Sequence, residues 1–227
     1  MKIDGFIFDF DGTLGDSFPL ILSAFKSALA RHLGREYTDE EITAHFGVTE
    51  EGMLRRMAPG CWEACLAAYL EEYDRMHPLR ARLFPGIVDV LTLLKQRGAR
   101  LAIVTGKGPR SMAISLRHLG LADYFSQVEV GSAEQPEKPR AIRKVVSGWG
   151  LPPGTVAYVG DAGYDMESAR EAGVIPLGAG WAGTADIKGL GRTTPAKLFT
   201  SVGSFLDWLQ KEVELPGDRK VADNASR

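Results

Sequence analysis

Five short apolar runs divide the chain, and each has the length of a buried strand. Residues 3–10 form an almost wholly apolar and aromatic run that ends in Asp-Gly. Similar runs follow at residues 100–105, 127–130, 155–160 and 173–177. Continuous apolar runs of this length are typical of strands that are buried on both faces of a sheet. The pattern therefore predicts five strands of one sheet.

Segments with helical spacing of apolar residues lie between these runs. Three of them follow Pro85-Gly86, Pro109 and Pro139, and a fourth precedes Gly173. Proline near the start and glycine just past the end are the expected boundaries of a helix. Strands that alternate with helices imply right-handed crossovers. The expected fold class is α/β, a parallel sheet with helices on both faces.

One long segment breaks this alternation. No strand-like run occurs between about residue 16 and residue 82, where helical patterns cover 18–33, 39–45, 50–57 and 61–77. An all-helical insertion directly after the first strand explains this, with a hinge where the chain crosses near 15–17 and 80–85. The expected division is a core of residues 1–15 and 83–215, a helical unit of residues 16–82, and a loose polar tail of residues 216–227.

The net charge and the cysteine content limit which partners, metal sites and compartments are expected. The net charge is -2 and the basic residues are scattered, which argues against binding of nucleic acid or an anionic membrane surface. Cys61 and Cys65 are four positions apart, but no histidine completes a zinc site, so buried thiols are expected. Two cysteines suit a reducing compartment. The oligomeric state cannot be read from this pattern.

No segment resembles a targeting or membrane-spanning sequence. Asp4, Asp9 and Asp11 interrupt the first apolar run, which leaves no stretch of signal-peptide length. No run approaches the roughly 20 apolar residues that span a bilayer. The sequence predicts a cytoplasmic protein.

Two carboxylates follow the first strand in the motif Asp9-Phe10-Asp11-Gly12. Separated by one residue, they lie on the same side of an extended chain, and Gly12 permits a sharp departure of the backbone. A carboxylate can attack phosphorus, and a neighbouring carboxyl group can protonate the leaving oxygen. Taken alone, the motif is equally compatible with a simple turn.

Two further strand ends offer groups that can hold a phosphoryl group. Thr105-Gly106-Lys107 follows the run 100–105 and supplies a hydroxyl and an open glycine amide. Lys138 opens the helix at Pro139 and supplies a cation. In isolation, a helix-capping loop and a surface lysine explain these residues as well.

The fourth strand end carries a pair of metal-ligand candidates. Asp161 and Asp165 follow the run 155–160 and offer the oxygen ligands that Mg²⁺ prefers. The carboxyl ends of parallel strands meet at one edge of a sheet, so all four motifs are expected to converge. Together they supply a nucleophile, an acid, a hydroxyl donor, a cation and metal ligands, which make one phosphoryl-transfer site.

These motifs resemble those of the haloacid dehalogenase-like hydrolase superfamily. Residues 9–14 are similar to its first motif, Thr105 to its second, Lys138 to its third, and residues 160–165 to its fourth. The resemblance extends to about residue 210, and residues 84–98 look like the phosphoglycolate phosphatase branch. It implies a Rossmann-like core with a helical cap inserted after the first motif.

The resemblance also implies a role for each site residue. Asp9 would take the phosphoryl group, and Asp11 would protonate the leaving group and then activate water. Mg²⁺ would be held by Asp9, Asp161 and the backbone carbonyl of Asp11, with Asp165 in support. Gly106 departs from the asparagine of many relatives, which puts substrate contacts in doubt. The expected phosphate- and substrate-binding residues are Gly12, Thr105, Gly106, Lys138 and Arg55.

Three other activities are known within the family that the chain resembles. A dehalogenase resembling the family's namesake would lack an aspartate at position 11, and Asp11 is present. A phosphonatase would use a cap lysine, and the only lysine of residues 16–82 is Lys26, away from the expected loop. A sugar-phosphate mutase resembling beta-phosphoglucomutase uses the same four motifs and remains open.

A phosphate- or nucleotide-binding regulatory module is an alternative from a different class of protein. Its support in the sequence is one glycine-rich segment. Residues 178–183 read G-x-G-x-x-G. The dinucleotide fingerprint follows the first strand and opens a helix, whereas this segment follows the fifth strand, so a loop is expected.

The substrate is expected to be a small phosphorylated metabolite. Phosphoglycolate, pyrophosphate, a nucleotide monophosphate and a sugar phosphate all remain compatible. Substrate choice is expected to lie in the helical insertion, around residues 45–48, with Arg55 clamping a substrate carboxylate as in phosphoglycolate. A solvent-facing Arg55 is the alternative.

Overall fold

Six parallel strands form the central sheet, in the order β5-β4-β1-β6-β7-β8. The computed structural model describes residues 1–219. All neighbouring strands of this sheet run parallel, so their carboxyl ends share one edge. The strands are β1 (Gly5–Phe8), β4 (Arg100–Val104), β5 (Gln127–Glu129), β6 (Val156–Gly160), β7 (Ile175–Ala179) and β8 (Lys197–Phe199). The expected α/β class with a Rossmann-like sheet is confirmed.

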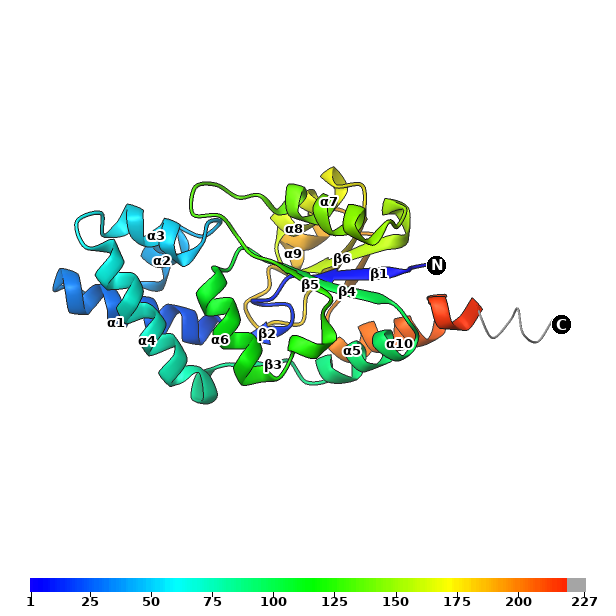
Figure 1. The fold of residues 1–227 in the computed structure, drawn as a ribbon, viewed down its shortest axis with the longest axis horizontal. Helices are drawn as coiled ribbons and strands as arrows, with labels where there is room; N and C mark the ends of the chain where they lie inside the picture. Colours follow the sequence, from blue (N-terminus) through cyan, green and yellow to red (C-terminus); the bar gives the residue numbers. More distant parts are fainter. Residues whose placement is uncertain (220–227) are drawn as a thin grey trace.

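Helices cover both faces of this sheet (Figure 1). Phe6 and Phe8 of β1 point into a hydrophobic cluster shared with α5 (Ile87–Gln96) and α10 (Val202–Lys211). Ile7 points the other way, into a cluster shared with two helices on the opposite face. Those helices are α7 (Lys138–Trp149) and α8 (Gly163–Glu171), with α9 (Ile187–Arg192) beside them. Two short 3₁₀ turns precede strands: η1 (Ala122–Tyr124) precedes β5 and packs on the α5 side, and η2 (Pro153–Thr155) precedes β6. This alternation is why the first strand is apolar at every position.

Four helices within residues 18–80 form a separate layer at one end of the molecule (Figure 1). Phe25, Tyr69 and Tyr73 lie at the centre of their own hydrophobic cluster. The chain leaves the sheet through β2 (Gly15–Asp16) and returns through β3 (Arg82–Leu83), and these two strands pair antiparallel. The four helices are α1 (Phe18–Leu33), α2 (Asp39–Thr43), α3 (Glu50–Met57) and α4 (Trp62–Arg80).

A buried polar cluster joins α4 to α6 (Pro109–Leu119). The Ser115 hydroxyl lies 2.9 Å from the Tyr73 hydroxyl and 3.2 Å from Nε2 of His77. The His77 ring stacks on His118 with centroids 4.7 Å apart. Burial lowers the pKa of His77 to about 4, and the positive charges of His118, Lys107 and Arg117 act in the same direction against the opposing Asp74 carboxylate. His77 is therefore neutral near pH 7.

The structure extends the sequence-based expectations at the C-terminal end. Strand β8 and helices α9 and α10 were not expected from the sequence. Residues 216–219, expected in a loose tail, instead contact the core, since Gly217 N–H donates to the Arg97 carbonyl at 2.7 Å and Arg97 pairs with Asp218 at 3.1 Å. The remainder of the expected tail, residues 220–227, lies outside the described residues. None of the helices in residues 1–219 has the length and apolar character needed to cross a membrane.

Candidate active site

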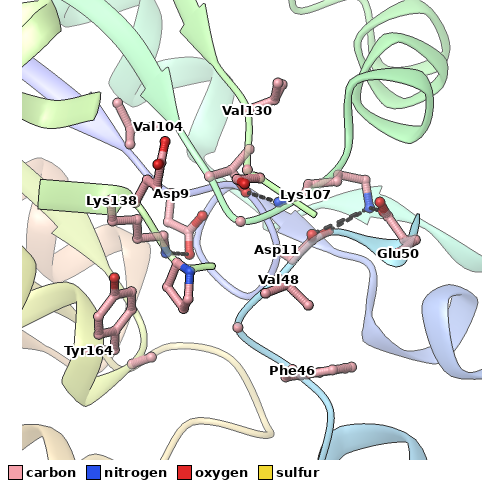
Figure 2. Close-up of a pocket in the computed structure, with 18 of the residues that line it drawn as sticks. Asp9, Asp11, Phe46, Val48, Glu50, Val104, Lys107, Val130, Lys138 and Tyr164 are labelled. Atoms are coloured by element: carbon pink, nitrogen blue, oxygen red, sulfur yellow. Dashed lines mark hydrogen bonds and ion pairs between the residues drawn. The ribbon is translucent and has the colours of Figure 1, made fainter. Parts of the chain in front are cut away.

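The four motifs predicted from the sequence converge on one pocket, at the edge of the sheet where the strands end (Figure 2). Asp9 and Asp11 follow β1, Thr105 follows β4, and Asp161 follows β6. Lys138 begins α7 and reaches the carboxylate of Asp9 at 2.7 Å, across 129 positions of sequence. The pocket has a volume of about 500 Å³ and is lined from both the sheet edge and the helices α1 and α3.

Asp9 is buried and held rigidly. Its backbone N–H donates to the Val159 carbonyl at 2.9 Å, which ties the end of β1 to β6. Its Oδ1 accepts the Phe10 N–H at 2.7 Å, and its Oδ2 accepts from Lys138. These contacts fix the side chain in one orientation, with the carboxylate facing the pocket.

Three carboxylates lie close enough to share one metal ion. Single oxygen atoms of Asp9, Asp161 and Asp165 lie within 4.8 Å of one another. Burial raises the pKa of Asp161 well above its ordinary value, and the neighbouring Asp165 and Asp9 charges raise it further. A hard divalent cation with a preference for oxygen ligands would relieve this repulsion, so the residues present fit Mg²⁺.

Gly12 is what allows Asp161 to sit where it does. Its φ is +80°, and a Cβ at this position would lie 2.2 Å from Oδ2 of Asp161. Thr13 Oγ1 donates to Oδ1 of the same carboxylate at 3.3 Å. The turn that follows Asp11 therefore constrains where the Asp161 carboxylate lies.

Lys138 bridges two of the carboxylates. Its Nζ lies 2.5 Å from Oδ1 of Asp165 as well as 2.7 Å from Asp9. Burial alone would lower the pKa of the Lys138 ammonium, but the Asp165 and Asp9 carboxylates raise it well above its ordinary value. Asp165 is also held by the Ala162 N–H at 3.0 Å and the Tyr158 hydroxyl at 3.3 Å. Lys138 thus stays charged at the point where phosphoryl oxygens would bind.

Asp11 belongs to a second charged cluster, on the side of the pocket that faces α3 (Figure 2). It accepts from the Ser17 hydroxyl at 2.5 Å and from Lys107 at 3.3 Å. Burial raises the pKa of Asp11, although Lys107 and Ser17 oppose the shift. Lys107 also lies 3.7 Å from Glu50 and 4.5 Å from the centre of the Tyr73 ring.

Glu50 connects α3 to the start of α6. Its Oε2 accepts the Gly108 N–H at 2.8 Å, and its Oε1 accepts the Ser111 hydroxyl at 2.5 Å. A carboxylate at the N-terminus of a helix is stabilised by the exposed N–H groups and the helix dipole. Through Glu50, the layer of helices α1–α4 is anchored beside the catalytic candidates.

Thr105 and Gly106 line the pocket as the sequence predicted, whereas Arg55 does not. The Arg55 side chain pairs with Glu51 at 2.6 Å and Glu134 at 3.6 Å and lies over the Trp62 ring. The geometry does not support a substrate clamp at Arg55, because its guanidinium is already engaged outside the pocket.

Lys107 and Glu50 were not among the site residues predicted from the sequence. Lys107 stood within the quoted Thr105-Gly106-Lys107 motif, and its place two residues past a strand end was the available signal. Glu50 carried only a local signal, since Thr49 caps α3 and acidic residues are common in a first turn. Burial of Glu50 against α6 depends on tertiary packing.

In the glycine-rich segment 178–183, residues 180–183 lie outside strands and helices, as expected for a loop, whereas Gly178 and Ala179 end β7. Gly178 lies inside β7, and the next helix begins only at Ile187. Trp181 from this loop donates its indole N–H to the Thr13 carbonyl at 2.9 Å. The segment therefore supports the first motif and lacks the strand-to-helix turn of a dinucleotide site.

Comparison with known proteins agrees with this geometry. Residues 6–179 match the family model described as haloacid dehalogenase-like hydrolase. The phosphoglycolate phosphatase of Synechococcus elongatus is 34% identical over 179 residues, which cover 77% of this chain and 82% of that protein.

Solved structures share the fold. The crystal structure of a predicted phosphoglycolate phosphatase from Haemophilus somnus has a TM-score of 0.77 at 22% identity, covering 90% of this chain and 97% of that one. CbbY from Rhodobacter sphaeroides, in complex with phosphate, has a TM-score of 0.75 at 20% identity, covering 89% and 96% of the two chains. The chain is an enzyme that belongs to the haloacid dehalogenase-like hydrolase family.

Proposed function

We propose that this hydrolase is a Mg²⁺-dependent phosphatase that acts on a small phosphorylated metabolite through an aspartyl-phosphate on Asp9. One observation carries the proposal. A buried nucleophile candidate shares a 4.8 Å cluster with two further carboxylates and contacts a charged lysine at 2.7 Å. These are the groups that phosphoryl transfer requires. The names of relatives such as the Synechococcus elongatus phosphoglycolate phosphatase support the same class of reaction.

The reaction proceeds in two steps. An Asp9 carboxylate oxygen attacks phosphorus, a P–O bond forms, and the bond from phosphorus to the leaving oxygen breaks. Asp11 gives its proton to the leaving alkoxide. Asp11 then takes a proton from water, whose oxygen attacks phosphorus and breaks the bond to Asp9, which releases inorganic phosphate.

The other residues bind and orient. Asp9, Asp161 and Asp165 would hold Mg²⁺ together with the backbone carbonyl of Asp11. The bound ion would neutralise phosphoryl charge and orient the attack. Lys138, the Thr105 hydroxyl and the Gly106 backbone would hold the phosphoryl oxygens, because these groups surround Asp9 at the end of the sheet.

We assign residues 16–82 as a cap, with residues 1–15 and 83–215 as the catalytic core. The separate hydrophobic cluster of helices α1–α4 and the paired crossings β2 and β3 support this division. Closure of such a cap over the pocket would exclude water from the leaving group.

The test compares the native enzyme with Asp9→Asn on a panel of small phosphate monoesters, with Mg²⁺ and with EDTA. We expect phosphate release that requires the metal and falls by roughly 10³-fold or more in Asp9→Asn. Asp207→Asn is the matched control, because Asp207 is 65% exposed and lies on α10. Acid quenching and peptide mass spectrometry should find a phosphoryl group on Asp9. Equal turnover by Asp9→Asn would refute the covalent mechanism, and transfer to a sugar phosphate without release would favour a mutase.

A further inference from the structure

The part of the pocket beyond the phosphoryl site is mostly apolar. Phe18, Phe46, Val48 and Met53 line it from the inserted helices and their connecting loops. The Phe18 and Phe46 rings stack with centroids 6.1 Å apart. Aromatic and aliphatic walls with few polar groups are typical of pockets that bind an apolar ligand body.

Large apolar side chains are also exposed at this pocket. Phe46, Val130 and Tyr164 are 39%, 36% and 39% exposed, and all three line it. In Figure 2 the rings of Phe46 and Tyr164 lie on either side of the space next to Asp9 and Asp11. Exposed apolar groups gathered around a cavity indicate a surface that a ligand covers.

The positively charged side chains that line the pocket, in contrast, are already paired with carboxylates. The lining residues include two lysines and no arginine or histidine, against five carboxylates. Lys138 is paired with Asp9 and Asp165, and Lys107 is paired with Asp11 and Glu50. With a divalent cation in place and Asp11 protonated as the acid, four carboxylates face four cationic charges among these lining residues, so no positive charge is left for a second anion.

The N-terminus of α6, directly after Lys107, is occupied as well. The start of α6 offers the Gly108 N–H and the Ser111 hydroxyl, and both donate to the Glu50 carboxylate. A second anionic group of a substrate would find this N-terminus filled and would face the Glu50 charge. Burying an unpaired anion beside a like charge is costly.

We propose that the organic part of the substrate is uncharged and apolar, and that the pocket rejects monoesters whose leaving group carries a second anion. The proposal rests on the proposed function, since it names the substrate class of the same site. The volume of about 500 Å³ accommodates an alcohol the size of a substituted aromatic ring. Phosphoglycolate and pyrophosphate, each with a second anionic group, fall in the rejected class.

Two substrates of matched shape test this directly. 4-Ethylphenyl phosphate and 4-(carboxymethyl)phenyl phosphate differ mainly in the charge at the far end of the leaving group. We expect kcat/KM with Mg²⁺ to be at least about tenfold higher for the neutral ester. Ethyl phosphate and phosphoglycolate form a second pair with the same expected direction. An equal or higher kcat/KM for the carboxylated member of both pairs would overturn the inference while leaving the phosphatase proposal intact. No phosphate release from any ester would refute both.

Two variants tie the preference to the apolar wall. Phe46→Ala should lower kcat/KM for 4-ethylphenyl phosphate by about tenfold and change ethyl phosphate less, because only the larger ester reaches this ring. Leu79→Ala is the matched control, since Leu79 is 76% exposed and does not line the pocket. Phe46→Arg adds a cation at the wall and should raise kcat/KM for the carboxylated ester relative to the neutral one. A preference unchanged in both Phe46 variants would contradict the assignment.

Discussion

Gly12→Ala is the substitution that tests most directly how the first motif shapes the proposed metal site. Gly12 has a φ of +80°, where an L side chain is strained. An added Cβ would lie 2.2 Å from Oδ2 of Asp161 and 2.9 Å from a ring carbon of Phe18. Neither distance is compatible with van der Waals contact, so the Asp161 carboxylate must move.

Two effects of different size are expected from this change. The left-handed backbone costs about 1–2 kcal/mol of folding free energy for any L residue. Displacement of Asp161 should in addition weaken Mg²⁺ binding by roughly 10- to 100-fold, the range seen when the support of a metal ligand is lost. The second effect is specific to Gly12, because the clash involves a metal-ligand candidate.

Gly34→Ala separates the two effects. Gly34 ends α1 with a φ of +68°, and an added Cβ would have no atom within 4 Å. Urea unfolding in EDTA should show a loss of about 1–2 kcal/mol in this control and at least as much in Gly12→Ala. Titration of phosphate release with Mg²⁺ should shift to higher concentration in Gly12→Ala alone. The same Mg²⁺ requirement in both variants would show that Gly12 does not shape the metal site.

Two further substitutions test the contacts between α6 and the inserted helices. The free energy of unfolding should fall by about 2 kcal/mol from pH 7 to pH 5 through His77 alone, because its unfolded imidazole takes up a proton below pH 6.5 and the folded one only near pH 4. His77→Leu should reduce the measured pH dependence by that amount in urea titrations, and equal slopes would contradict the argument. Glu50→Gln should lower the free energy of unfolding by about 1–2 kcal/mol, because charge-assisted hydrogen bonds to Gly108 and Ser111 become neutral ones. Glu51→Gln, on the solvent side of α3, should cost less than about 0.5 kcal/mol, and an equal loss would refute a special role for Glu50.

Local sequence signals were sufficient to predict a helix where capping residues, proline or glycine mark its ends. The sequence predicted helices at residues 18–33 and 50–57, and both match α1 and α3 to the residue. Proline in the first turn and left-handed Gly34 bound α1, and Thr49 caps α3. Convergence of Asp9 with Lys138 followed from topology alone, since parallel strands bring their carboxyl ends to one edge.

The elements that the sequence did not predict are short or are buried on one side only. Strand β8 has three residues, includes a lysine, and pairs only with β7 at the edge of the sheet, so its apolar run is too short to recognise. Helix α10 did carry a usable signal, because its buried residues follow helical spacing after a serine cap. Those residues are Val202, Phe205, Trp208 and Leu209.

The side of α3 that faces the pocket could not be read from the sequence, because no local signal says how the helix is oriented. Glu50 and Met53 are three residues apart and share a face, and both line the pocket. Arg55 lies two residues beyond Met53, a rotation of roughly 200° about the helix axis. Once the orientation of α3 is known, helical spacing places Arg55 outside the pocket.

The orientation of α3 also connects the packing of the inserted helices with the proposed substrate preference. Glu50 holds the inserted helices against α6, and in doing so it fills the helix N-terminus and pairs with Lys107 beside Asp11. The contact that holds α3 against α6 is thus also the contact that occupies groups able to bind a second anion. A substrate carboxylate would have to displace Glu50 to be bound, and displacing Glu50 would loosen the cover over the reacting group. The proposed rejection of leaving groups that carry an anion therefore follows from the packing of α3 against α6.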